Sequence, residues 1–97
     1  MLDLDPTITT EVVALIKKHL PNVTIKAFGS RVNGKASTYS DLDVALIAEG
    51  AISHNTLNRL KFDLSSSDIP FMIDIVDWHT LTPEFQSAIN SHFQILC

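Results

Sequence analysis

Residues 29–47 read GSRVNGKASTYSDLDVALI, and this stretch determines how two strands and their polar groups are joined. The residues just before it, 23–28, are short, apolar and β-branched, so they predict a strand that stops at Gly29. The polar residues 30–40 predict a loop with one helical turn just after Ser30. Residues 41–48 are apolar in alternation and predict a second strand.

The second strand begins with two carboxylates, Asp41 and Asp43, which should point the same way because side chains alternate along a strand. Two like charges side by side repel each other unless a cation lies between them. Mg²⁺ suits two hard carboxylate oxygens and usually completes its shell with water and phosphate oxygens. Upstream, Gly29-Ser30 forms a turn that a phosphate can approach closely. The pattern therefore indicates nucleotide chemistry.

A third carboxylate, Asp74, lies inside the apolar run FMIDIV at residues 71–76, which predicts a third strand. A carboxylate there is costly unless it is paired or bound to metal. If this strand lies beside the second, Asp74 joins Asp41 and Asp43, which is the arrangement that two-metal phosphoryl transfer needs. Each element also has a plainer interpretation: a turn for Gly29-Ser30, a solvated strand edge for the acid pair, and a backbone or Arg partner for Asp74. Asp77, three residues later, should face the other way, outside the cluster.

Helices are expected to alternate with the strands along the chain. Apolar residues at helical spacing predict helices over residues 6–20, about 53–66, and from Thr82 through Leu96, the last carrying Phe85, Ile89 and Phe93. We expect Phe85, Phe93 and Ile95 to pack in the core rather than dock a partner. The alternation predicts an α/β (α+β) fold, a single domain over residues 1–97 with a small mixed sheet flanked by helices.

The composition, 45% hydrophobic and 19% charged over 97 residues, is that of a folded globular protein. No apolar run approaches the ~20 residues that span a bilayer, so no membrane association is expected. The formal charge of −4 argues against direct nucleic-acid binding and favours a protein or small molecule as recipient. The single Cys97 and the acidic N-terminus predict a cytoplasmic location. The four scattered His residues do not suggest zinc.

Gly29-Ser30, ten intervening residues, Asp41-Leu42-Asp43 and the later Asp74 together resemble the DNA polymerase beta-type nucleotidyltransferase superfamily. The form GSRVNG…SDLDVAL resembles its minimal nucleotidyltransferases (MNT), the antitoxins of HEPN/MNT toxin–antitoxin systems. The resemblance runs from Val23 to the last predicted helix. It implies that Gly29 and Ser30 hold the β- and γ-phosphates, and that Asp41, Asp43 and Asp74 are catalytic ligands of two Mg²⁺ ions.

Arg31 would add a cationic contact to the triphosphate, and the alternative is that Arg31 is a solvent-exposed charge. Lys35 is more simply interpreted as a solvated lysine, and Ser40 as a residue that caps the turn.

The resemblance implies an antitoxin that transfers AMP from ATP to a tyrosine of its HEPN partner, an RNase toxin, and so silences it. Two alternatives remain open at this point. One is an antitoxin that only binds and covers the toxin. The other is an enzyme that modifies a small molecule such as an aminoglycoside, although no second domain is predicted to hold such a substrate.

Overall fold

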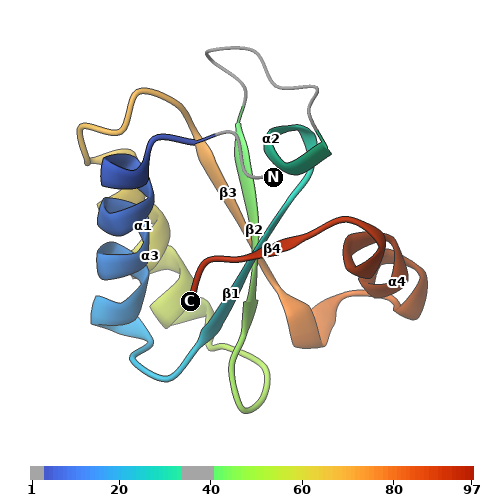
Figure 1. The fold of residues 1–97 in the computed structure, drawn as a ribbon. Coiled ribbons are helices and arrows are strands. Elements are labelled where there is room, and N and C mark those ends of the chain that lie inside the picture. Colours follow the sequence, from blue (N-terminus) through green and yellow to red (C-terminus); the bar gives the residue numbers. More distant parts are fainter. Residues whose placement is uncertain (1–3, 34–40) are drawn as a thin grey trace.

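The computed structural model describes residues 4–33 and 41–97 of the chain (Figure 1). Along these residues the elements follow one another as α1 (Pro6–His19), β1 (Thr24–Phe28), α2 (Ser30–Asn33), β2 (Leu42–Ile47), α3 (His54–Ser65), β3 (Ile73–Asp77), the 3₁₀ turn η1 (Trp78–Thr80), α4 (Pro83–Ser91) and β4 (Gln94–Ile95). No helix in these described ranges is both long and apolar enough to cross a membrane.

The strands form one mixed sheet in the order β3-β2-β1-β4. β1 runs antiparallel to β2 and to β4, whereas β2 and β3 run parallel. The parallel pair requires a crossover, which α3 provides between β2 and β3. The predicted α/β (α+β) class is therefore confirmed, and the condition that the third predicted strand lies beside the second is met.

Helices α1 and α3 lie side by side against one face of the sheet (Figure 1). The side chains of Leu42, Val44 and Leu46 on β2 are fully buried on this face, as the alternation predicts. They join a core contributed by both helices and the three longer strands: Val12, Ile16, Val23, Ile25, Ala27, Val32, Leu60, Leu64 and Ile75. This core leaves the alternate residues of β2, including Asp43, on the opposite face.

Each covering helix has a side-chain cap at its N-terminus. The Asp5 carboxylate accepts from the backbone N–H of Thr7 at 2.8 Å, and Pro6 occupies the first helical turn. At α3, the Ser53 hydroxyl accepts from the N–H of Thr56 at 3.2 Å. These caps fix where both helices begin.

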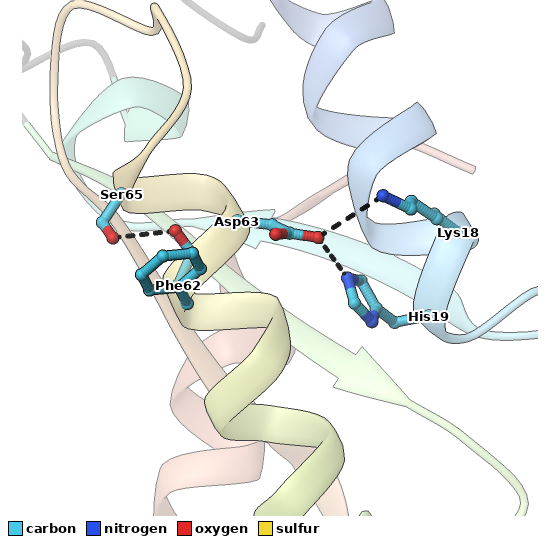
Figure 2. A network of polar contacts seen from close by, with 5 residues as sticks. All are labelled: Lys18, His19, Phe62, Asp63 and Ser65. Carbon is cyan, nitrogen blue, oxygen red and sulfur yellow. Dashed lines mark hydrogen bonds and ion pairs between the residues drawn. The ribbon is translucent and has the colours of Figure 1, made fainter.

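The two helices are also joined by a polar contact (Figure 2). The Asp63 carboxylate of α3 meets His19 Nε2 of α1 at 2.6 Å and Lys18 Nζ at 3.8 Å. In the last turn of α3, the Ser65 hydroxyl donates to the carbonyl of Phe62 at 2.9 Å. The α1–α3 layer is thus held by apolar packing beneath and by Asp63 at its rim.

Helix α4 lies on the other side of the sheet (Figure 1) and packs mainly through Ile89, which is almost fully buried. The Phe85 ring meets the Phe28 ring of β1 edge to face, with centroids 6.0 Å apart. Lys26 Nζ of β1 donates to Asn90 Oδ1 at 2.8 Å. This face of the sheet is therefore covered by α4 on the side of β1.

Lys26 also tethers the end of the chain. Its ammonium lies 4.7 Å from the centroid of the half-buried Trp78 ring and 4.4 Å from that of Phe93. Trp78, the first residue of η1, thus lies beside a cation.

The predicted extent of the last helix is wrong. α4 ends at Ser91, His92 is extended, and Gln94–Ile95 forms a short strand paired with Lys26–Ala27. The free edge of β1 offers backbone groups that a strand satisfies better than a continued helix. Consequently the core assignment of three aromatic and apolar residues is also wrong: Phe85, Phe93 and Ile95 remain 43%, 40% and 46% exposed.

Candidate active site

Gly29 forms the turn between β1 and α2 and has a φ of 81°, which L side chains rarely adopt. Its carbonyl accepts from the N–H of Val32 at 3.0 Å, which closes the turn. A Cβ at this position would overlap Oδ2 of Asp43 on β2. Only glycine therefore lets this backbone approach the Asp43 carboxylate so closely.

Asp43 lies between two strands that carry other parts of the predicted site. In the sheet it is the register partner of Phe28 on β1, the residue before Gly29, and of Asp74 on β3. Residues in register across a sheet share a face, so Asp74 and Asp43 project from the same side. The structure thus places the Gly29 turn, Asp43 and Asp74 in one row across three strands.

The carboxylates of this row act on one another. Burial raises the pKa of Asp43, and the negative charges of Asp74 and then Asp41 raise it further. Asp43 is half-buried, whereas Asp74 and Asp41 are exposed, Asp41 just before β2 begins. Asp43 therefore lies close enough to each of the other two acids for their charges to act on it.

These carboxylates suit a hard divalent cation by their chemistry, since Mg²⁺ takes oxygen ligands from one or two carboxylates together with substrate phosphates. Over residues 4–33 and 41–97, however, no three His, Cys, Asp or Glu side chains converge closely enough to form a metal site by themselves. The assignment of Asp41, Asp43 and Asp74 as metal ligands stays a prediction.

Arg31, the next predicted contact, is only 5% exposed, so the interpretation as a solvated charge is wrong. Its guanidinium lies 4.0 Å from the centroid of the Phe71 ring, in the segment that precedes β3. Phe71 had no predicted role, because nothing in the sequence indicates which aromatic ring meets Arg31. Contact between Arg31 and phosphate stays a prediction.

Ser30 is described only by its backbone at the start of α2, so its contact with phosphate stays a prediction. Lys35 and Ser40 lie outside the described residues.

Asp77, which was expected to face away from Asp41, Asp43 and Asp74, is buried and only 4% exposed. Its carboxylate accepts from the N–H of Ile52 at 2.7 Å and from the N–H of His79 at 3.1 Å. It therefore ties the end of β3 to the loop before α3. Its strand neighbour Asp74, on the opposite face, is exposed.

Comparison with known proteins agrees with this geometry. Residues 10–97 match the sequence model of the family described as Polymerase beta, Nucleotidyltransferase. The chain is 37% identical over 95 residues to a probable protein adenylyltransferase, MntA, of Haemophilus influenzae; the match covers 98% of this chain and 83% of that protein.

Two solved structures share the fold. A toxin–antitoxin complex with AMP-PNP superposes with a TM-score of 0.79 at 21% identity, over 92% of this chain and 72% of that one. A tri-AMPylated Shewanella oneidensis HEPN toxin in complex with its MNT antitoxin gives a TM-score of 0.68 at 20% identity, over 92% and 68% of the two chains. The resemblance first carried by Gly29-Ser30 and the three acids is thereby confirmed, and this chain belongs to the polymerase beta nucleotidyltransferase family, as a minimal nucleotidyltransferase of the MntA type.

Proposed function

We propose that this protein is an antitoxin that uses ATP and Mg²⁺ to transfer AMP to a tyrosine of a cognate HEPN RNase toxin in the cytoplasm. The observation that carries the proposal is the row formed by the Gly29 turn, Asp43 and Asp74 across three neighbouring strands. It places a glycine turn, whose backbone lies close to the Asp43 carboxylate, in line with two carboxylates that suit a metal.

In the proposed reaction the phenolic oxygen of tyrosine attacks the α-phosphorus of ATP. The bond from the α-phosphorus to the oxygen bridging to the β-phosphate breaks, pyrophosphate leaves, and the phenolic proton passes to solvent water beside Asp74. Mg²⁺ held by Asp41, Asp43 and Asp74 would supply charge neutralisation for the triphosphate and the attacking oxygen. The chain itself positions the groups: Gly29 admits phosphate, and Asp43 and Asp74 fix the line of attack.

The protein target is supported by the relatives. The Haemophilus influenzae relative bears the name of a probable protein adenylyltransferase. Among the proteins that share the fold, one is an MNT antitoxin in complex with a tri-AMPylated HEPN toxin, and another belongs to a toxin–antitoxin complex with AMP-PNP. The choice of tyrosine and of Mg²⁺ rests on the resemblance and on the oxygen donors of the site.

The test is to incubate the chain with ATP, Mg²⁺ and its cognate HEPN protein, and then to measure the intact mass and RNase activity of the HEPN protein. We expect its mass to grow by one or more AMP groups on tyrosine, with loss of RNase activity. A double variant, Asp41→Asn with Asp43→Asn, should leave the mass unchanged. Asp68→Asn, an exposed carboxylate in the turn after α3, is the matched control and should behave as wild type.

The same variants separate catalysis from occlusion. If the double variant still silences the toxin without modifying it, the protein acts by covering its partner. If the wild-type chain leaves the mass of an active HEPN protein unchanged in the presence of Mg²⁺ and ATP, the proposed function is wrong.

A further inference from the structure

A groove runs along the outer edge of β3. It has a volume of about 680 Å³ and lies between the last turns of α3 and the segment that leads into β3. We call it the β3-edge groove, and Phe62, Phe71, Met72 and Asp74 are among the residues that line it. A volume of this size is in the range of ligand-binding sites, about 300–1,000 Å³.

Two apolar side chains of the groove are unusually exposed. Phe62 on α3 is 69% exposed and Met72 just before β3 is 71% exposed, above Phe85, Phe93 and Ile95. Phe62 does not belong to the core, unlike Leu60 and Leu64 of the same helix. Large apolar side chains grouped at a groove on the surface typically mark a protein contact.

The order of the strands places this groove on one definite side of the acid row. β3 is the edge strand, so from the Gly29 turn at the end of β1 the row passes Asp43 on β2 and Asp74 on β3, and then reaches the groove. Asp74 lines the groove and its charge also acts on Asp43. Because the Gly29 turn is where the triphosphate would approach, the groove borders the carboxylates at Asp74, on the side away from that turn and at the edge of the sheet next to α3.

We propose that the β3-edge groove docks the tyrosine-bearing segment of the partner protein. This inference rests on the proposed function and names its acceptor site. The occupant is a segment of the HEPN protein in which apolar side chains flank the target tyrosine: these pack against Phe62 and Met72, while the phenolic hydroxyl reaches Asp74. Arg31 under Phe71 ties the groove wall to α2, the helix that follows the Gly29 turn.

The first test is kinetic. A double variant, Phe62→Ser with Met72→Ser, removes two exposed side chains and should fold normally. We expect the KM for the HEPN protein to rise about tenfold, as for loss of an interface hot spot, with kcat and the KM for ATP close to wild type. The matched control is Phe93→Ser with Ile95→Ser, also exposed and apolar but beside β4, which should leave all three constants unchanged.

The second test locates the partner directly. A photo-crosslinking phenylalanine analogue is placed at Met72 in one protein and at Phe93 in another, and each is irradiated with the HEPN protein and AMP-PNP. From position 72 we expect crosslinks within a few residues of the tyrosine that the active enzyme modifies; position 93 should give none there.

The outcomes separate the two proposals. If the wild-type chain modifies no tyrosine, the proposed function and this inference fall together. If the wild type modifies tyrosine, but the groove variant keeps its KM for the HEPN protein or the segment crosslinks from position 93, only the groove assignment is wrong.

Discussion

At the scale of single residues, the site depends on how closely Gly29 and Asp43 approach. The sequence predicted a turn at Gly29 from residue type alone, and the positive φ agrees with a turn there. It could not predict that Asp43 would lie where a side chain of residue 29 would be, because that contact depends on the antiparallel register of β1 and β2. Glycine at position 29 therefore has a structural role beside Asp43, and its contact with phosphate stays a prediction.

Gly29→Ala should therefore damage both stability and activity. The positive φ alone costs an L-alanine about 1–2 kcal/mol, and the new methyl group must displace the Asp43 carboxylate. We expect a lower Tm and at least ~10-fold slower AMP transfer, since small misplacements of reacting groups are costly. Gly50→Ala is the control, because a Cβ at Gly50 meets nothing within 4 Å. Wild-type activity in Gly29→Ala would contradict this account of the turn.

Asp74 and Asp77 lie three residues apart on β3 and should respond oppositely to substitution. Asp77→Asn places an amide NH₂ against one of two backbone N–H donors, so we expect a loss of about 1–3 kcal/mol in the free energy of unfolding, with transfer retained in folded molecules. Asp74→Asn, on an exposed side chain, should abolish transfer with little change in stability. Urea unfolding and transfer assays on both variants check this; the reverse assignment would mean that Asp77 faces the site.

At the scale of elements, the contact between α1 and α3 is sensitive to acid (Figure 2). The hydrogen bond from His19, and next the positive charge of Lys18, hold the pKa of Asp63 below its ordinary value of 3.8. A lowered pKa in the folded state means that the contact stabilises the fold fully above pH 3.8 and loses this contribution as the pH falls through the lowered value.

Asp63→Asn should therefore remove part of the acid sensitivity. Near pH 6 we expect the wild type to be the more stable protein, and the difference should shrink as the pH falls below 3.8. Urea unfolding of both proteins across this range measures it. Asp68→Asn, in the exposed turn after α3, controls for a general loss of negative charge. A constant difference over the whole range would show that Asp63 stabilises the helices by something other than its charge.

The elements themselves show where prediction from sequence stops. Alternation and helical spacing located α1, α3 and the first three strands, because each buries one regular face. The same rule failed after Ser91: residues 85, 89, 93 and 96 keep a helical spacing, yet the chain becomes extended and forms β4. β4 is only two residues long and exposed, and it exists because the edge of β1 is free to pair. Such pairing depends on distant residues and leaves no local pattern.

At the scale of the whole molecule, the strand order gathers negative charge at one place on a chain that already carries −4. Parallel pairing of β2 and β3 brings Asp43 and Asp74 into register, and the sequence could only state this as a condition. Burial and the neighbouring carboxylates raise the pKa of Asp43, so its ionised form opposes folding when no cation is present. In the metal-free protein, the carboxylates of the candidate site therefore lower the free energy of unfolding.

Asp43→Asn should therefore shift the Tm in opposite directions in the absence and in the presence of ligand. Without metal at pH 7, Asp43→Asn should raise the Tm, and the gain should disappear in acid, where Asp43 is protonated whether folded or not. With Mg²⁺ and a non-hydrolysable ATP analogue the order should reverse, because only the wild type binds them; ligand at a hundredfold excess over its Kd adds about 2.7 kcal/mol. Thermal unfolding with EDTA and with Mg²⁺ measures both signs, and Asp68→Asn should follow the wild type in each. If Asp43→Asn is the less stable protein in EDTA, the Asp43 carboxylate helps to hold the fold, and the acid row is not strained by its own charge.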